Sequence, residues 1–266
     1  MPRKPRLVVH GSLYHIMARS LPQYNLFSDS TDAEKFMNLL EKYLQQSGCK
    51  CYAWVLMGNH YHLVITLGTT ELWELMKPLN MQYALFHGRK YGRRGPLFLD
   101  RYKSIVTQDQ NYVEQLIRYV HLNPIRAGIC KNLTSLAKYP WSGHRALLGI
   151  TENKFQDIKT VLKRFGTTRK AARAAYMDFL ADGLRPKDGD NFLSLLRDSN
   201  NGKESGRDPG CWVIGDADYV CQILNDVEQK RLRITRFKKE GNNLESIAQK
   251  ICRYFDLANG ALKIRW

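Results

Sequence analysis

The sequence lacks the long apolar runs and paired cysteines that mark membrane proteins and disulfide-rich proteins. No stretch of about 18 consecutive apolar residues occurs. The basic first residues are followed by neither an unbroken apolar segment nor a small-residue cleavage site. The six cysteines are scattered without a C-x-x-C pair, a pattern typical of reduced thiols. We therefore expect a cytoplasmic protein without a membrane segment.

Acidic residues are scarce relative to basic ones. The 266 residues include 41 Lys and Arg against 25 Asp and Glu, which gives a formal net charge of +16. Residues 1–150 hold 19 of the basic and 9 of the acidic residues. An excess of this size is typical of proteins that bind a polyanion, most often nucleic acid. A basic surface that serves only solubility is the alternative.

The first 150 residues alternate strand and helix patterns. Thr31 with Glu34 is expected to cap the first helix, Gly58 and Asn59 to form a hairpin turn, and Pro124 to end the last helix. The order βαββαβα predicts an α+β fold, with a ferredoxin-like antiparallel sheet and helices on one face. Strands are predicted at 13–19, 49–57, 61–67 and 97–107, and helices at 29–48, at 70–92 with a start or kink at Pro78, and at 109–124.

The chain after residue 150 has a different character. Residues 155–184 have a helical pattern with a break at Gly166, and residues 211–234 predict a short strand or turn followed by a helix. Residues 243–266 begin like a helix-turn-helix with an incomplete second helix, or like any αα-hairpin. We expect four parts: a first domain at 1–150, a helical extension at 151–185, a Gly-, Asp-, Asn- and Ser-rich linker at 186–210, and a helical C-terminal region at 211–266.

Two histidines, His60 and His62, stand at the start of the third predicted strand. Side chains at i and i+2 of a strand project from the same face, so both rings are expected to point together. An H-x-H pair taken alone is a weak signal, because most such pairs are not metal sites. A metal site would need a third ligand from elsewhere in the chain.

The predicted helix 109–124 offers that ligand. Tyr119 and Asn123 are four residues apart, on the flank of the apolar stripe of this helix, and are therefore neighbours. Asn123 could add a neutral oxygen to the two histidines, a mixture that suits Mg²⁺ or Mn²⁺ bound also to a phosphate. The Tyr119 phenol could act as a nucleophile. Its alternative role is that of an amphipathic residue at the edge of the core.

Basic residues interleaved with aromatic ones lie between the histidines and this helix. Such a segment fits a groove that neutralises phosphates and stacks unpaired bases, although a solvated turn is the alternative. The first residues of the chain are basic as well. The residues expected to contact DNA are Arg3, Lys4, Arg6, Arg89, Lys90, Arg93, Arg94, Arg101 and Lys103.

These stretches together resemble the HUH single-tyrosine transposases, and within them the REP-associated tyrosine transposase branch of the IS200-like transposases. Gly58 departs from the proline that is usual before the Asn-His pair, which affects the turn and not the ligands. The stretches that carry the resemblance are MPRKPR at the start, YHIMAR (14–19), MGNHYHLVI (57–65), GPLFLDRYKSI (95–105), RYVHLNPIRAGI (118–129) and YPWSGHRALLG (139–149).

The resemblance implies a specific activity for residues 1–150. His60 and His62 would bind a divalent metal, Asn123 would complete the site, and Tyr119 would attack a phosphodiester of single-stranded DNA. A 5′-phosphotyrosine link and a free 3′-OH would result, and a later 3′-OH attack would rejoin the strand. The implied substrate is single-stranded DNA beside a hairpin, as in repetitive extragenic palindromes. The protein would be a monomer or a homodimer, with Tyr119 serving its own chain or its partner.

Two other functions remain open at this point. The first is a domesticated protein of the same fold that binds DNA hairpins with little catalysis. The second, from a different class, is an RNA-binding module on a ferredoxin-like sheet. The second would need an RNP pattern of surface aromatic residues on the central strands, and the sequence contains none.

Overall fold

The structure is a computed structural model that describes residue 9 and residues 11–68, 70–185, 211–215 and 217–239, together with residues 249 and 253. Its internal contacts divide the chain into two units, residues 1–216 and residues 217–266, and each is described by itself. Arg3, Lys4, Arg6 and the predicted linker lie outside the described residues, as does the predicted helix-turn-helix apart from residues 249 and 253.

Four antiparallel strands form the centre of the first unit. They are β1 (Leu13–Arg19), β2 (Lys50–Met57), β3 (His60–Thr66) and β4 (Lys103–Thr107). Their spatial order is β2-β3-β1-β4, which is the order of a ferredoxin-like βαββαβ unit. The predicted fold class is therefore confirmed. The two-residue turn at Gly58 and Asn59 is confirmed as well, because Met57 and His60 pair directly across it.

Both edges of this sheet have partners. A fifth strand, β5 (Cys211–Ile214), pairs in parallel with β4. The sequence predicted a purely antiparallel sheet, so this part of the prediction was wrong. At the other edge, β2 exchanges backbone hydrogen bonds with the chain around Trp141: the amide of Leu56 donates to the carbonyl of Trp141 at 2.9 Å, and the amide of Gly143 donates to the carbonyl of Trp54 at 2.9 Å. A covered edge has no free backbone groups for pairing with another chain.

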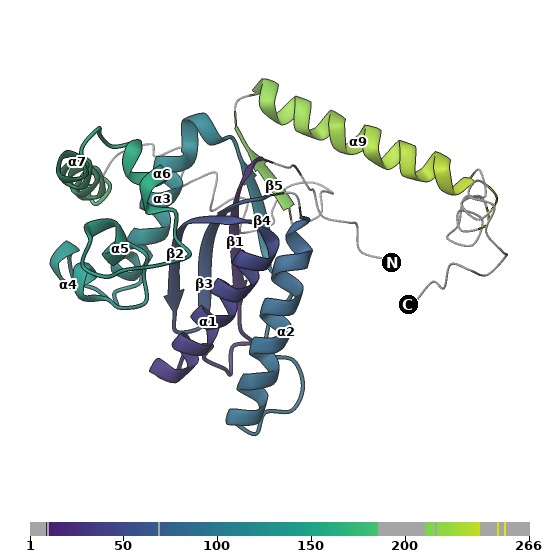
Figure 1. The fold of residues 1–266 in the computed structure, drawn as a ribbon. Coiled ribbons are helices and arrows are strands. Elements are labelled where there is room, and N and C mark those ends of the chain that lie inside the picture. Colours follow the sequence, from purple (N-terminus) through teal and green to yellow (C-terminus); the bar gives the residue numbers. More distant parts are fainter. Residues whose placement is uncertain are drawn as a thin grey trace. The chain divides into compact units, whose positions relative to one another are not determined.

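Helices cover both faces of the sheet. Helices α1 (Ser30–Ser47) and α2 (Leu72–Lys90) lie side by side on one face, where the Phe36 and Tyr61 rings are 4.6 Å apart (Figure 1). Helix α3 (Asp109–Arg126) packs its apolar stripe against Leu13 and Val64, which point the other way. The predicted one-sided arrangement thus holds for α1 and α2 of the βαββαβ unit, while the helix that follows lies on the opposite face.

Several element boundaries differ from the prediction. Asp29, and not Thr31, caps α1: its side chain accepts a hydrogen bond from the amide of Asp32, 3.0 Å away. The last strand is Lys103–Thr107 instead of 97–107, because only this part pairs along β1. Helix α2 is one helix that contains Pro78, with no second start.

Helix α3 also continues past Pro124 to Arg126, whereas the sequence predicted its end at Pro124. Proline lacks the amide that would donate to the carbonyl of Val120. The side-chain amide of Asn123 compensates, since its Nδ2 lies 2.8 Å from the carbonyl oxygen of Tyr119 and 3.5 Å from that of Val120. The short bond goes to Tyr119, and the bond to Val120, the carbonyl that the proline leaves without a donor, is a weak one.

Four shorter helices follow α3 and pack beside it and β2. The predicted break at Gly166 is confirmed, because it separates α6 from α7. Tyr176 of α7 holds α3 in place, since its hydroxyl lies 2.8 Å from Nδ1 of His121 and 2.7 Å from Nδ1 of His144. These helices are α4 (Leu133–Lys138), α5 (His144–Leu148), α6 (Ile158–Lys163) and α7 (Arg169–Asp182).

The second unit contains α9 (Ala217–Lys239), which follows β5 as the strand-then-helix prediction for residues 211–234 required. Among the described helices of the chain, none combines the length and the apolar character needed to cross a membrane. The four-part division of the chain remains a prediction.

Candidate active site

His60 and His62 project from the same face of β3, as predicted from their spacing. Their ring centroids are 5.1 Å apart. His60 is half-buried and His62 is buried. Nδ1 of His60 lies 2.7 Å from Oδ1 of Asn59, and because an amide oxygen only accepts, Nδ1 carries the proton. The lone pair of His60 is therefore on Nε2, the nitrogen that remains for a ligand.

Tyr119 of α3 lies against one member of this pair, His62. Its ring meets the His62 ring edge to face, with the centroids 5.8 Å apart. The guanidinium of Arg126, two turns along α3, lies over the Tyr119 ring at 5.5 Å from its centroid. The structure thus brings together the predicted nucleophile and a predicted ligand that are 57 positions apart in the chain.

A third histidine, His15 of β1, completes the group and was missed by the sequence analysis. Its Nε2 is 2.8 Å from Nδ1 of His62, and its ring also contacts Tyr119, with the centroids 5.5 Å apart. His15 is buried, with 1% of its surface exposed. A polar residue on the α3 face of a strand was visible in the alternation of residues 13–19. The sequence did not reveal the register that places it beside His62.

Asn123 lies one helical turn beyond Tyr119. Helix α3 starts directly after β4 at the Leu13 end of the sheet and runs back, so this turn leads toward the end that carries His60. The Nδ2 atom of Asn123 is bound to its own helix. Oδ1 is therefore the atom that Asn123 can direct toward a cation.

Burial keeps all three histidines neutral. It lowers the pKa of His60 to about 4, with the charge of Arg19 as a further cause, and that of His15 to about 3. Burial and the neighbouring His15 hold the pKa of His62 well below its usual value. Neutral imidazoles retain the lone pair that a metal ligand needs, so these rings are available as ligands at neutral pH.

Positive charge surrounds the histidines. Arg19 pairs across β1 and β3 with His60, and Lys103 of β4 pairs with Met17, two residues from Arg19. The side chains of Arg19, His60 and Lys103 all stand on the α3 face, because each alternates along its strand with residues that face α1 and α2. Burial and the charge of Arg19 lower the pKa of Lys103. Such a surface attracts a phosphate.

The other basic residues predicted to bind DNA have different surroundings. Arg89, Arg94 and Arg101 are exposed. Arg93 is used within the protein, since its guanidinium donates to the carbonyl of Ala84 at 2.8 Å and lies over the Tyr24 ring.

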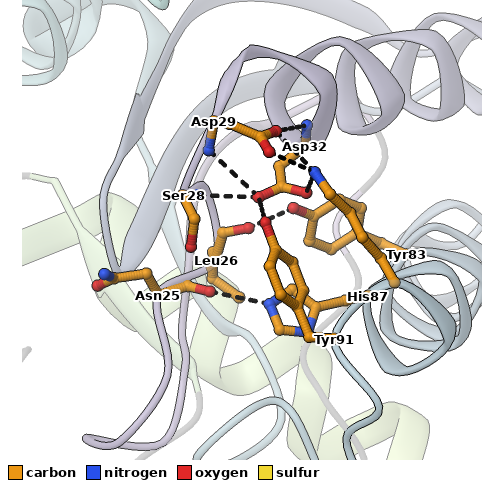
Figure 2. Close-up of polar contacts among 9 residues, drawn as sticks. Asn25, Leu26, Ser28, Asp29, Asp32, Tyr83, His87 and Tyr91 are labelled. Atoms are coloured by element: carbon orange, nitrogen blue, oxygen red, sulfur yellow. Dashed lines mark hydrogen bonds and ion pairs between the residues drawn. The ribbon is translucent and has the colours of Figure 1, made fainter.

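Lys90 belongs to a cluster that we call the Asp32 network, formed by Asp29, Asp32, Lys90 and Tyr91 on the side of the sheet covered by α1 and α2. The Lys90 ammonium lies 2.7 Å from a carboxylate oxygen of each aspartate. The Tyr91 hydroxyl donates to Asp32 at 2.7 Å, as Figure 2 shows. The charge of Lys90 is thus already compensated inside the protein, and its part in DNA binding remains a prediction.

Tyr61, between the two histidines, points to the opposite face as expected. It is fully buried, and its hydroxyl donates to Oδ1 of Asn80 at 2.7 Å. Burial raises the pKa of its phenol far above the usual value. Tyr61 is therefore a core residue and no candidate nucleophile.

The residues present fit a divalent cation only in part. His60 offers Nε2 with its proton fixed on the other nitrogen, and Asn123 can offer Oδ1. Among the described residues, however, no group of three or more His, Cys, Asp or Glu side chains is arranged to hold a metal. A site made of neutral ligands beside Arg19 and Lys103 favours a cation that shares its coordination with a phosphate.

Residues 8–123 match the family model described as "Transposase IS200 like". This segment contains the predicted site residues His60, His62, Tyr119 and Asn123, whereas Arg126 lies beyond it. The match supports a function of the transposase type, that of a DNA-processing enzyme. A search among curated proteins finds no match for the sequence.

Solved structures offer similarities of low identity. A REP-associated tyrosine transposase bound to a REP hairpin is 15% identical, with a TM-score of 0.47, over 59% of this chain and 98% of that one. A proposed transposase from Deinococcus radiodurans R1 is 18% identical, with a TM-score of 0.32, over 45% and 95%. A tRNA(His) guanylyltransferase from Saccharomyces cerevisiae is 8% identical, with a TM-score of 0.35, over 69% and 85%. At TM-scores of this size, these similarities carry no argument about activity.

Proposed function

We propose that the protein cleaves and rejoins single-stranded DNA beside a hairpin, with Tyr119 as the nucleophile and Mg²⁺ or Mn²⁺ held by His60, His62 and Asn123. The observation that carries the proposal is the contact of Tyr119 with His62. A phenol beside a predicted metal ligand, within a segment that matches the IS200-like transposase model, supports this reaction. The finer assignment to the REP-associated branch is part of this proposal.

In the proposed reaction, the phenol oxygen of Tyr119 attacks the phosphorus of a phosphodiester. The O–P bond to the tyrosine forms as the P–O3′ bond breaks. The phenol loses its proton and the leaving oxygen becomes a 3′-OH, which leaves a 5′-phosphotyrosine. Attack by a second 3′-OH reverses the step and frees Tyr119. One P–O bond is exchanged for another, so no ATP is consumed.

The residues around Tyr119 have different roles in this reaction. A bound metal would polarise the phosphate and stabilise the negative charge on the leaving oxygen. The neutral imidazoles of His60 and His62 would hold it, together with the side-chain oxygen of Asn123. Arg126 over the Tyr119 ring favours the charge that the phenol acquires as it loses its proton. The contacts of Tyr119 with His15 and His62 of its own chain support a site in which Tyr119 serves its own chain.

The RNA-binding alternative lacks support from the fold. RNP-type modules stack bases on an open face of their sheet. Here the central positions that face α3, such as Leu13, Val55 and Val64, are fully buried. The positions that face α1 and α2, such as Ile16 and Leu63, are buried too. These central positions of the sheet therefore offer no open surface on which bases could stack.

The test is incubation of the protein with labelled single-stranded hairpin DNA and Mn²⁺, followed by SDS gel electrophoresis. We expect a protein–DNA adduct that survives SDS and disappears with EDTA. Tyr119→Phe should abolish the adduct and leave DNA binding intact. Tyr112→Phe, which removes the same hydroxyl elsewhere on α3, should retain it. An adduct at the wild-type level in Tyr119→Phe would refute the nucleophile, and DNA binding without any adduct in the wild type would favour a hairpin-binding protein without turnover.

A further inference from the structure

His15 is the most buried polar neighbour of the proposed metal ligands. The His15 and His62 rings lie 7° from parallel, with centroids 5.1 Å apart. Their facing nitrogens, Nε2 of His15 and Nδ1 of His62, are 2.8 Å apart. The two rings are thus nearly coplanar, and one hydrogen bond joins them from β1 to β3. His15 occupies the Nδ1 edge of His62 and contacts Tyr119 as well.

Only one proton arrangement of this pair leaves His62 able to bind a metal. If Nδ1 of His62 donates to His15, the lone pair of His62 is on Nε2, on the side away from His15. If His15 donates instead, Nε2 of His62 carries a proton and cannot be a ligand. Nδ1 of His62 is occupied by His15 in both cases. The hydrogen bond therefore leaves Nε2 as the nitrogen of His62 that can reach a cation.

We infer that His15 is a positioning residue that orients His62 and selects its Nδ1-protonated form for metal binding; this inference rests on the proposed function. The arrangement has a cost in the protein without metal. In the competent form, the proton of His15 resides on its Nδ1, which is buried and has no hydrogen-bond partner among the described residues. A buried donor without a partner is unfavourable. Binding of the cation compensates for that cost by selecting this proton arrangement.

Partners of this kind hold a ligand ring in place and typically contribute about 10- to 100-fold to metal affinity. His15→Leu keeps the volume apolar and removes the acceptor, so Mn²⁺ should bind about 10- to 100-fold more weakly. His15→Gln places an amide oxygen near the position of Nε2 and should restore most of the affinity. His87, another buried histidine but on α2, provides the matched control: His87→Gln should leave Mn²⁺ affinity unchanged.

The experiment is titration of the metal-free full-length protein with Mn²⁺ alone, with free Mn²⁺ followed by electron paramagnetic resonance. Nitrogen NMR of His62 with Mg²⁺ provides the second readout, since it shows which ring nitrogen carries the proton, and a merely structural role of His15 would leave this unchanged. Thermal melting confirms that each variant is folded. Equal Mn²⁺ affinity in wild type and His15→Leu, or a metal-bound His62 protonated at Nε2, would overturn the inference. Normal Mn²⁺ binding without any DNA adduct would contradict only the proposed function.

A second and independent observation concerns Arg19. This residue is exposed and stands directly across from His60 in the β1–β3 register. Lys103 lies on the next strand, diagonal to it. Cross-strand neighbours on one face have Cβ atoms about 5 Å apart. The long side chains of Arg19 and Lys103 can therefore reach the same ligand. No ion pair of the Arg19 guanidinium is found among the described residues.

We propose that Arg19, together with Lys103, binds the phosphodiester that Tyr119 attacks, an assignment that also rests on the proposed function. A cation beside two metal ligands weakens metal binding by repulsion, so its position is explained by an anion that both contact. A DNA phosphate is such an anion. The planar guanidinium of arginine suits it, because two N–H groups can donate to two phosphate oxygens.

The test uses Arg19→Gln, Arg19→Lys and the control Lys77→Gln, which removes an exposed charge on α2 at the opposite face of the sheet. DNA binding is measured in a Tyr119→Phe background, and the adduct rate in the active protein. Arg19→Gln should weaken DNA binding several-fold, reduce the salt slope by about 0.7, and slow adduct formation at saturating DNA at least about tenfold. Arg19→Lys should recover part of both, and Mn²⁺ affinity should not fall. An Arg19→Gln protein that matches Lys77→Gln, or that loses affinity without losing rate, would overturn the assignment.

Discussion

The two faces of one sheet carry two polar clusters that differ in how their charges are satisfied. On the face of α1 and α2, the Asp32 network is closed: the buried Asp32 carboxylate accepts from the amide of Ser28, the Tyr91 hydroxyl and the Lys90 ammonium at 2.7 to 2.9 Å. Every charge in it has an opposite charge beside it. Such a cluster fixes the loop before α1 against the end of α2 (Figure 2).

On the α3 face, the cluster around His62 is open. It combines three neutral histidines, a phenol, Arg19 and Lys103, and no group of three or more His, Cys, Asp or Glu side chains in the described part of the chain is arranged to hold a metal there. Nδ1 of His15 has no hydrogen-bond partner in the described part of the chain. We expect a cation and a phosphate from outside to complete this cluster.

The contrast separates a structural cluster from a functional one. Both contain buried polar groups, so burial alone does not distinguish them. A closed cluster gives up stability when one member is removed, because the remaining groups lose their partners. In an open cluster, some polar groups lack a partner in the folded protein from the start. Removal of one member should therefore affect ligand binding far more than folding.

The largest expected effect falls on the open cluster. His62→Gln should lower the rate of adduct formation at least about a hundredfold, because a weakly held metal no longer stabilises the leaving oxygen. Its free energy of unfolding, from urea titration, should change less than that of Asp32→Ala. If His62→Gln formed the adduct at the wild-type rate, the cluster on the α3 face would have no part in DNA cleavage.

The next effect concerns the closed cluster. Asp32→Ala should lower the free energy of unfolding by about 2–4 kcal/mol, because the ammonium, the phenol and the backbone amide lose their acceptor together. Glu34→Ala, an exposed residue in the same turn of α1, should change it by about 0.5 kcal/mol or less. Urea titration measures both values. Adduct formation per folded molecule should be unchanged in Asp32→Ala, and a selective loss of activity would reverse the comparison.

The smallest expected effect is a difference in DNA binding between two neighbouring cations at the end of α2, Arg89 and Lys90. Arg89 is exposed, so Arg89→Met should reduce the salt slope of single-stranded DNA binding by about 0.7, as expected for one lost phosphate contact. Lys90→Met should leave the slope nearly unchanged, since its ammonium is bound to two aspartates. Fluorescence anisotropy at several salt concentrations gives both slopes. Equal losses in the two variants would mean that DNA competes with the Asp32 network for Lys90.

Much of the fold could be predicted from local sequence. Period-two alternation identified β1, the Gly-Asn pair fixed the β2–β3 hairpin, and the order of elements predicted the ferredoxin-like arrangement. Two of the errors occurred where a side chain replaces a backbone group. Asp29 instead of Thr31 caps α1, and the amide of Asn123 allows α3 to pass Pro124. Such substitutes depend on side-chain rotamers, which residue patterns do not specify.

The site was predictable to the same extent. The spacing of His60 and His62 placed them on one face, and the four-residue spacing of Tyr119 and Asn123 made them neighbours, because both depend only on the periodicity of a strand or helix. The sequence did not indicate the positions of His15 and Arg19 beside the predicted ligands, nor the ion pairs of Lys90 with Asp29 and Asp32. These three cases depend on contacts between residues that are 41 to 61 positions apart.

By itself, the sequence determined the strands and helices of the first domain, the face on which each candidate residue stands, and an excess of positive charge suited to a polyanion. Only the tertiary structure decided which faces meet: that α3 lies opposite α1 and α2, that β5 joins β4, and that His15 shares a hydrogen bond with His62. The physical reason is that periodicity is a local property of the backbone. Strand register and helix packing result from the whole core, and they decide which polar groups find a partner inside the protein.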